Sequence, residues 1–306
     1  MLSHNLQFDP PIGVAEDLGA GVRRVVAPNP SAMTFRGTNT YLIGTSNVAV
    51  IDPGPANPLH LDALLYALAP KQRVSHILVT HTHSDHAPLA PILSRETNAP
   101  VYGFGNASAG RSAIMQTLSE AGLAGGGEGI DDSFAPDVVL FDGAEIIGEE
   151  WRLTALHTPG HIGNHLCFRF GDILFSGDLV MGWASSLVSP PDGDLADFMR
   201  SCRRLQATVW NRFYPGHGAP VTAPNRRLEC LIAHRRRREA SILEVLKAGP
   251  AGACELARQI YTTTPVVLHS AATRNVLAHL IYLTQRQRIR PLGELSQYAA
   301  FALITD

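Results

Sequence analysis

Cysteine is scarce in this sequence of 306 residues. The four cysteines, Cys167, Cys202, Cys230 and Cys254, are far apart, and no two of them form a CxxC pair. This spacing indicates neither a thiolate zinc site nor a disulfide framework. A reducing cytoplasm is therefore the compartment we expect.

Long apolar runs are also missing. No stretch reaches the roughly 18 consecutive apolar residues of a membrane span, and the first residues lack the basic and apolar regions of a secretory signal. The chain is 17% charged and 45% hydrophobic, with its 27 Gly and 21 Pro spread along it, which excludes disorder and collagen-like repeats. We expect a compact protein with no membrane partner.

Charge is unevenly distributed, although the formal net charge is only -2. Residues 223–306 contain 12 Lys and Arg but 6 Asp and Glu, so they carry a net +6, whereas residues 1–222 carry a net -8. The length suits one large domain and one smaller one. We therefore predict two domains, 1–222 and 223–306.

Short apolar runs rich in β-branched residues recur in the first domain and end at Gly, Pro or Asp. They predict strands over residues 40–44, 48–54, 76–81, 101–104, 138–143, 151–160, 166–170 and 172–178. Because these runs are almost continuously hydrophobic, both faces of each sheet should be covered by helices.

Helical spacing of apolar residues predicts helices over residues 58–68, 87–97, 108–121 and 195–205, the last capped by Asp194. Composition predicts a loop over 122–129. The second domain should contain helices over 226–247, 253–261 and 270–288 and a final strand near 301–304. The fold class is thus α+β, with a small C-terminal helical or winged-helix domain.

The segment HTHSDH concentrates polar side chains directly after an apolar strand. His81, His83, Asp85 and His86 lie within six residues of one another. Packing explains such a cluster poorly, because each buried polar group would need its own partner. The pattern is typical of a metal site at the carboxyl end of a strand.

Three further polar residues occupy equivalent positions. His161, Asp178 and His217 each follow a glycine at the end of an apolar run, which allows the chain to turn sharply there. Five imidazoles and two carboxylates can thus converge on one rim of the sheets, a ligand set that suits zinc. Seven ligands exceed the four of one tetrahedral ion and fit two ions that share a carboxylate.

The motifs HTHSDH (81–86), TPGH (158–161), SGD (176–178) and YPGHG (214–218) resemble, in order, those of the metallo-β-lactamase superfamily of hydrolases. The resemblance covers about residues 20–222. It implies a four-layered αβ/βα sandwich and two Zn²⁺ ions, with Mn, Fe or Ni as possible substitutes in the isolated protein. By this resemblance the first ion is held by His81, His83 and His161. The second ion is held by Asp85, His86 and His217, and the carboxylate of Asp178 bridges the two ions.

Residues 29–44, 178–194 and 234–239 and the helical tail resemble a subgroup that includes lactamase-beta-like protein two. Its members include a single-strand-directed endoribonuclease and thioesterases acting on carrier-bound polyketides, and they carry a C-terminal winged-helix-like domain. Asn164 departs from the Asp that relatives often have at that position, which affects hydrogen bonding around the site rather than the ligands.

The resemblance implies a dinuclear zinc hydrolase in which a metal-bridging hydroxide attacks an ester, thioester or phosphodiester and Asp85 orients that hydroxide. Three hypotheses remain open: a small-molecule ester or thioester hydrolase, an endoribonuclease cutting single-stranded RNA, and a nucleic-acid-binding regulator with a vestigial metal site. The acidic first domain favours the first and the basic tail the second, whereas the intact ligand set disfavours the third. The oligomeric state stays open.

Several other residues have two interpretations each. Asp52 either forms a turn or accepts a proton from a ligand imidazole. The remaining candidates either contribute to the site or serve ordinary packing and solvation. Thr38, Asn39 and Tyr41 are candidate cleft residues, and Trp183, Ser185 and Ser186 are candidate substrate contacts. His157 and His165 are candidate supports of a ligand, and Arg235–Arg238 form a candidate phosphate-binding cluster.

Overall fold

The computed structural model describes residues 7–125 and 129–304. Its larger sheet has seven strands in chain order; the first four are antiparallel to one another, and the pairings from the fourth strand to the seventh are parallel. These strands are β1 (Glu16–Gly19), β2 (Val22–Val26), β3 (Asn39–Ile43), β4 (Asn47–Ile51), β5 (Arg73–Leu78), β6 (Val101–Gly103) and β7 (Val138–Val139).

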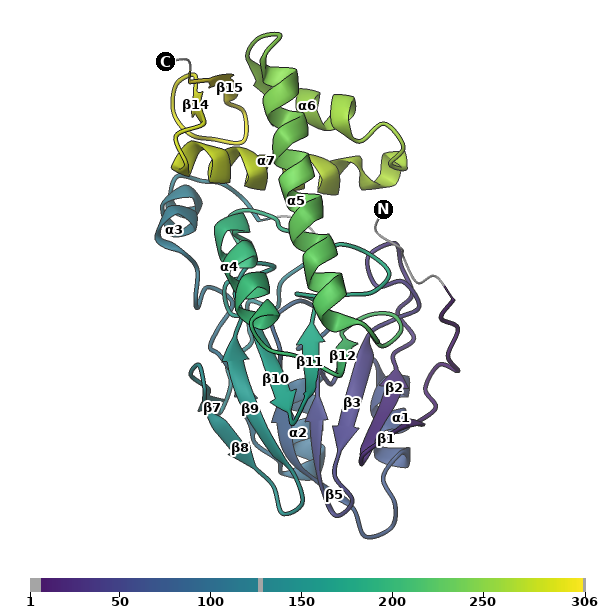
Figure 1. Ribbon diagram of the computed structural model, residues 1–306. Coiled ribbons are helices and arrows are strands. Elements are labelled where there is room, and N and C mark those ends of the chain that lie inside the picture. Colours follow the sequence, from purple (N-terminus) through teal and green to yellow (C-terminus); the bar gives the residue numbers. More distant parts are fainter. Residues whose placement is uncertain (1–6, 126–128, 305–306) are drawn as a thin grey trace.

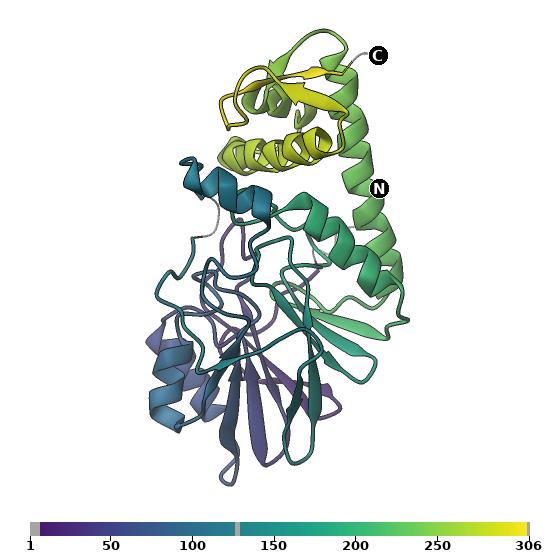
Figure 2. The same cartoon turned by 90° about the vertical axis from the view of Figure 1, so that its left-hand side faces the viewer.

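A second sheet has five strands in the order β12-β11-β10-β9-β8, of which only β11 and β12 are parallel. Its strands are β8 (Glu145–Ile147), β9 (Arg152–His157), β10 (Leu166–Phe170), β11 (Ile173–Gly177) and β12 (Arg212–Pro215). The two sheets face each other, and helices cover their outer faces (Figure 2).

Side chains alternate between the two faces of each strand, and this alternation separates the core into layers. In β3, Tyr41 points into the cluster between the sheets, where it joins Phe168 of β10. Its neighbour Leu42 points outward and packs with Leu64 and Leu93, which lie on the helices that cover this sheet. Burial of both faces confirms the predicted four-layered αβ/βα sandwich and the α+β class.

The helices of this part are α1 (Pro58–Tyr66), α2 (Ala90–Thr97), α3 (Ala113–Glu120), α4 (Leu195–Gln206) and α5 (Pro224–Leu246). On the five-stranded sheet, Phe198 of α4 and Leu231 of α5 share one cluster with Leu174. The predicted cap is confirmed, because Asp194 Oδ1 accepts a hydrogen bond of 2.7 Å from the Ala196 N–H.

Some predicted boundaries are wrong. The helix predicted over 108–121 begins only at Ala113, since the hydroxyl of Ser112 donates to Asp194 of another element and a turn precedes it. The strand predicted over 138–143 is limited to β7, both of whose residues are exposed. The loop predicted over 122–129 includes residues 126–128, which lie outside the described residues.

The C-terminal part is a small domain with its own core. It contains α6 (Ala253–Ile260), the short 3₁₀ helix η1 (Val266–Leu268), α7 (His269–Gln285) and a sheet of β13 (Ala251–Gly252), β15 (Ala300–Leu303) and β14 (Ile289–Pro291). Leu256, Leu280 and Phe301 pack together in it, and Met115 of α3 joins them. The predicted winged-helix domain is confirmed, and so is its final strand, β15; the strands β13 and β14, of two and three residues, left no clear sequence signal.

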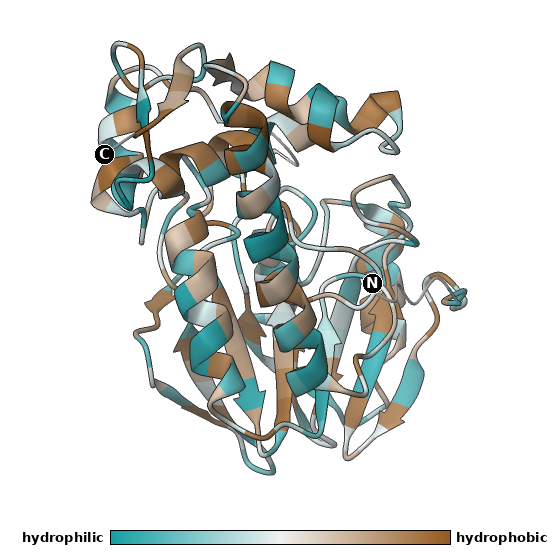
Figure 3. Cartoon of the chain, turned by 45° about the horizontal axis from the view of Figure 1, so that its top comes forward, coloured by the Kyte–Doolittle hydropathy of each residue, from teal (hydrophilic) through white to brown (hydrophobic). Residues whose placement is uncertain are grey.

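Helix α5 connects the two parts. It runs from the five-stranded sheet to the C-terminal helices (Figure 1) and alternates between hydrophilic and hydrophobic residues along its length (Figure 3). The predicted division between 222 and 223 falls just before this helix and stays a prediction. None of the helices within the described residues is both long and apolar enough to cross a membrane.

Candidate metal centre

All seven candidate ligands lie at one edge of the two sheets. His81, His83, Asp85 and His86 occupy the turn that follows β5, and each of the other three follows a strand of the second sheet: His161 after β9, Asp178 after β11 and His217 after β12. All seven side chains are buried. The structure therefore brings together every ligand candidate that the sequence motifs provide.

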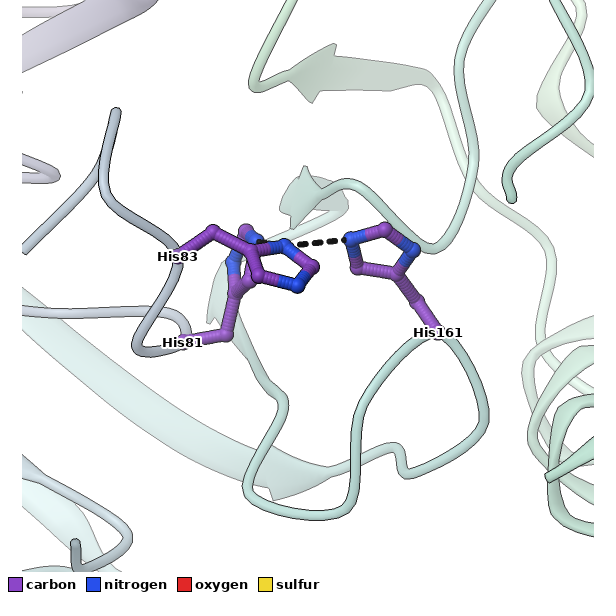
Figure 4. A group of neighbouring side chains, drawn as sticks. All are labelled: His81, His83 and His161. Atoms are coloured by element: carbon purple, nitrogen blue, oxygen red, sulfur yellow. Dashed lines mark hydrogen bonds between the residues drawn. The ribbon is translucent and has the colours of Figure 1, made fainter. Parts of the chain in front are cut away.

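Three histidines form the first group. His83 Nδ1 lies 2.9 Å from His81 Nε2 and 2.9 Å from His161 Nε2. Their rings turn toward one another from two separate loops (Figure 4). One nitrogen atom from each ring therefore faces a common point, as expected of three ligands of one ion.

Asp85, His86 and His217 form the second group. His217 Nε2 lies 3.1 Å from Asp85 Oδ2 and 3.3 Å from His86 Nε2. Asp178 lies between the two groups, because its Oδ2 is 3.2 Å from His217 Nε2 and 3.9 Å from His161 Nε2. One carboxylate thus reaches both groups.

Hydrogen bonds from the opposite ring nitrogens hold three of these imidazoles in place. His161 Nδ1 contacts Leu187 O at 2.7 Å, and His217 Nδ1 contacts Gly37 O at 3.2 Å. His86 Nδ1 contacts Asp52 Oδ2 at 2.9 Å. Since carbonyl and carboxylate oxygens only accept hydrogen bonds, each Nδ1 must carry a proton. In the neutral ring that a metal ion requires, Nε2 then turns its lone pair toward the cluster.

Asp52 is the support that the sequence suggested. Besides its contact with His86, its carboxylate accepts hydrogen bonds from the backbone and hydroxyl of Thr80 at 2.7 and 2.8 Å. The backbone of Asp52 has a φ of 52°, a conformation unfavourable for most residues other than glycine. Strain of this kind persists where surrounding contacts fix the geometry.

The glycines before the ligands are required by close packing. A Cβ atom on Gly177, where φ is 46°, would lie 2.6 Å from His165 Nε2, and one on Gly216 would lie 2.3 Å from Asp178 Oδ1. Gly160 has a φ of 144°, and its Cβ would lie 2.3 Å from the Phe198 backbone. Glycine therefore allows each of the three ligand-bearing turns to pack closely against its neighbours.

His165 supports a ligand through the backbone. Its ring is fully buried, its Nδ1 lies 3.0 Å from the Thr158 hydroxyl, and its Nε2 accepts the Asp178 N–H at 3.2 Å. His157 instead contacts Gly163 O and stacks on Phe104 beside the site. Of these two histidines, only His165 touches a candidate ligand within the described part of the chain.

Thr38, Asn39 and Tyr41 are buried supports rather than cleft residues. The Thr38 hydroxyl donates to Asp85 Oδ2 at 3.0 Å. The Asn39 amide and the Tyr41 hydroxyl both donate to Pro215 O, at 2.9 and 2.7 Å, and so fix the turn that carries His217.

Asn164, the departure from the family pattern, also holds a ligand-bearing turn. Its amide donates to the Thr82 hydroxyl and to Asn106 O, both at 2.9 Å. Thr82 lies between His81 and His83. The amide therefore supports the first group without the carboxylate that relatives often have.

Burial and neighbouring charges shift the pKa values of the clustered side chains in opposite directions. Burial and the nearby His161 lower the pKa of His83 to about 3, so His83 is neutral at pH 7. Burial opposes the charged form of His217, but the carboxylates of Asp178 and Asp85 outweigh it and raise the pKa to about 10. Against the penalty of burial, the histidines lower the pKa values of Asp85 and Asp178 well below their usual range.

The donor set fits metal ions. Ligand atoms on a tetrahedral zinc with bonds of about 2.0 Å lie about 3.3 Å apart, close to the separations of 2.9–3.3 Å between the ring nitrogens here. Asp178 Oδ1 is buried and has no hydrogen-bond partner among the described residues. A buried carboxylate oxygen without a partner is costly unless a cation contacts it.

A cavity of about 380 Å³ adjoins the first group. His83 and His161 line it together with Arg111, Asp132 and Asp192. Arg111 is paired with Asp192 at 2.7 Å. The cavity therefore offers substrates carboxylates and hydrogen-bonding groups beside the cluster, together with the apolar side chains of Ile130 and Leu187.

Of the residues suggested as substrate contacts, Trp183 and Ser185 line a separate cavity. Ser186 is buried, and its hydroxyl donates to Leu179 O at 2.8 Å. Ser186 therefore stabilises its own loop.

The four consecutive arginines point in different directions. Arg235 is buried and donates to Ser186 O and Asn275 Oδ1, and Arg238 donates to Ile260 O and lies 4.0 Å from the centre of the Tyr261 ring. Arg236 and Arg237 are exposed. Half of the cluster therefore serves internal packing.

The two covered sheets and the buried His/Asp cluster define a hydrolase of the αβ/βα sandwich class with a metal-binding site. The family model described as "Metallo-beta-lactamase superfamily" matches residues 33–226, and the one described as "Beta-lactamase associated winged helix domain" matches residues 253–296. The chain belongs to the metallo-beta-lactamase superfamily.

Similar proteins agree with this assignment. The Drosophila melanogaster "Beta-lactamase-like protein 2 homolog" is 30% identical over 89% of this chain and 91% of its own, which confirms the subgroup resemblance. An "Atrochrysone carboxyl ACP thioesterase" of a Cryptosporiopsis species is 28% identical over 78% of this chain and 66% of its own. A crystal structure of a beta-lactamase domain protein from Burkholderia ambifaria shares the fold, with a TM-score of 0.80, 20% identity and coverage of 97% of this chain and 96% of that one.

Proposed function

We propose that the protein is a dinuclear zinc hydrolase that acts on an ester or thioester. The observation that carries the proposal is the position of Asp178, whose carboxylate contacts histidines of both ligand groups. Two groups of three ligands with a carboxylate between them are the arrangement expected of two metal ions that share a ligand.

The proposal assigns each ligand by its group. His81, His83 and His161 would hold the first ion, Asp85, His86 and His217 the second, and Asp178 would bridge them. Zinc is favoured because the donors are imidazole and carboxylate with no thiolate. Elemental analysis distinguishes zinc from Mn, Fe or Ni, which N/O ligand sets also accept.

Bound zinc would supply Lewis acidity for the substrate carbonyl and acidify a water molecule. Asp85 is the catalytic carboxylate in this proposal, since its side chain is 13% exposed whereas that of Asp178 is 1% exposed. The Thr38 hydroxyl donates a hydrogen bond to Asp85 Oδ2 and so fixes the orientation of the carboxylate. Asp85 would hold the attacking water and orient it toward the substrate carbonyl.

An acyl substrate fits the adjoining cavity better than a polyanion. Asp132 and Asp192 line this cavity beside His83, and Arg111 is neutralised by its ion pair with Asp192. Carboxylates at this position repel phosphates. The thioesterase named among the relatives supports the same choice.

A single-strand-directed endoribonuclease is the second candidate. The exposed Arg236 and Arg237 and the net +6 of residues 223–306 favour it, because clustered cations supply affinity for phosphates. A nucleic-acid-binding regulator with a vestigial metal site is disfavoured by the complete set of buried ligands. We also propose a cytoplasmic location, because all four cysteines are free.

The test combines metal analysis with turnover. We expect about two zinc ions per chain and hydrolysis of an aryl ester or acyl thioester, without cleavage of fluorescent single-stranded RNA. His83→Ala and Asp178→Ala should each reduce turnover by at least about 10³-fold, because each removes a group that acts on the reacting centre. His269→Ala, a partly buried histidine on α7, is the matched control.

Circular dichroism should show that the variants remain folded. Full activity in a folded, metal-analysed His83→Ala protein would contradict the dinuclear mechanism. RNA cleavage that depends on His83, with no ester turnover, would establish the second candidate instead.

A further inference from the structure

A second cavity of about 190 Å³ lies between the catalytic part and the C-terminal domain. One wall comes from the loop after β11, with Met181, Trp183 and Leu187, and the other from the C-terminal domain, with Leu268 and Ala271. These side chains are apolar, whereas the cavity beside His83 is lined mainly by polar ones. The two cavities therefore suit different chemical groups.

The apolar cavity adjoins the metal centre through two of its wall residues. Leu187 lines both cavities, and its carbonyl oxygen contacts His161 Nδ1 at 2.7 Å. Trp183 packs against Gly218, since a Cβ atom there would lie 2.7 Å from its Cδ1. Gly218 directly follows His217. The walls of the cavity thus touch the surroundings of both ligand groups.

We infer that this cavity, framed by Trp183, Leu187 and Ala271, binds the apolar acyl group of the substrate while the scissile carbonyl lies at the metal centre. The inference rests on the proposed ester or thioester hydrolysis and names the part of the substrate that gives it specificity. The leaving group then occupies the polar cavity beside His83.

Three arginines, two on α5 and one on α7, hold the wall of this cavity in place. Arg227 donates to Met181 O at 2.7 Å and to Ala184 O at 2.6 Å. Arg235 donates to Ser186 O, and Arg274 donates to the Ser189 hydroxyl at 2.9 Å and to Pro190 O. Trp183 also stacks on Phe35, with ring centroids 5.0 Å apart. A wall ordered before binding lowers the entropy cost of taking up a ligand.

The volume sets the size of the acyl group. An apolar cavity of about 150 Å³ accepts a benzene ring, so 190 Å³ has room for one aromatic ring or a chain of about seven carbons. Each buried methylene contributes about a fourfold gain in affinity at most. We therefore expect kcat/KM to rise with chain length from acetyl to about heptanoyl and then to level off.

The first experiment measures kcat/KM of the zinc-loaded enzyme for p-nitrophenyl esters from acetyl to decanoyl. The Ala271→Phe variant fills the cavity, so the ratio of heptanoyl to acetyl kcat/KM should fall at least about tenfold. Ala240→Phe makes the same change at an exposed position of α5 and should keep the wild-type ratio. Thr264→Phe, at the partly exposed rim, is a second filling variant should Ala271→Phe fail to fold.

The second experiment does not depend on turnover. Heptanamide, an uncharged probe, is titrated into the zinc-loaded enzyme and its binding followed by calorimetry, with acetamide for comparison. We expect heptanamide alone to bind, and the filling variants to weaken it at least about tenfold. Because neither amide is an ester, this measurement reports the cavity separately from the reaction.

The outcomes separate the inference from the proposed function. Ester turnover without any dependence on chain length, or heptanamide binding that the filling variants leave unchanged, overturns the acyl cavity while hydrolysis stands. Heptanamide binding that the filling variants weaken, with no ester or thioester turnover, supports the cavity and overturns the proposed reaction. Absence of both binding and turnover overturns both.

Discussion

Replacing Asp52 by asparagine tests whether the hydrogen bonds behind the ligands control metal binding. The carboxylate accepts hydrogen bonds from His86 Nδ1, from the Thr80 backbone and from the Thr80 hydroxyl. Asparagine keeps the size but has only one accepting oxygen, so its NH₂ group must face at least one of these donors. We expect Asp52→Asn to release His86 from the orientation in which Nε2 faces the second group.

The expected loss follows from the number of ligands affected. His86 belongs to the second group, whereas the Nδ1 contact of His161 in the first group goes to Leu187 O. Loss of such a supporting carboxylate typically lowers metal affinity 10- to 100-fold, or about 1.4 to 2.8 kcal/mol. In the proposed dinuclear centre we therefore expect binding of the ion in the second group to weaken by this amount. The first group should be affected less, because Asp52 reaches it only through the Thr80 hydroxyl, which lies 2.9 Å from His81 Nδ1.

The assay is zinc retention against a series of chelator concentrations, measured by elemental analysis after gel filtration. Asp52→Asn should lose its first zinc at a chelator concentration about 10 to 100 times lower than the wild type. Asp172→Asn, an exposed carboxylate in the β10–β11 turn, controls for the change in charge. Equal retention in Asp52→Asn and the wild type would refute the role of Asp52.

Two further predictions address packing and pH. Gly177→Ala should lower the free energy of unfolding, measured by chemical denaturation, by about 2 to 5 kcal/mol. The new Cβ atom would displace His165 from the Asp178 N–H, and the backbone at this position has the left-handed conformation that disfavours alanine. A loss below about 1 kcal/mol would contradict this account. Burial lowers the pKa of His60 to about 4, below the 6.5 of the unfolded chain, so its contribution is complete above pH 6.5 and is lost as the pH falls toward 4. His60→Gln should therefore flatten the fall in stability between pH 6.5 and 4, as followed by thermal unfolding, and an unchanged slope would exclude His60 as a cause.

The clustering of the seven candidate ligands could be predicted from the sequence because their positions depend on local features. An apolar strand followed at once by HTHSDH, and glycine before each of His161, Asp178 and His217, places polar side chains at strand ends whatever the rest of the fold does. Burial of both strand faces likewise followed from continuous apolar runs.

The sequence suggested Asp52 as a support, but the partners of the other supports could not be predicted because they depend on contacts between distant segments. Thr38 meets Asp85, 47 residues away, and Asn39 meets Pro215, 176 residues away, so no local pattern marks either residue. His165 resembles an ordinary buried histidine until the Asp178 backbone is placed beside it. The predicted start of α3 was wrong for the same reason, because the Ser112 hydroxyl donates a hydrogen bond to Asp194, which caps α4.

The arginines that hold the loop after β11 limit how freely the two parts of the chain can be exchanged. Arg227, Arg235 and Arg274 all bind backbone oxygens of this loop, and the Leu187 carbonyl of the same loop contacts His161. Backbone oxygens are present whatever the loop sequence, so substitutions within the loop leave these bonds available. A chimera that replaces residues 223–306 must instead preserve the three guanidinium groups, or it loosens the support of His161, a candidate ligand that belongs entirely to the other parent.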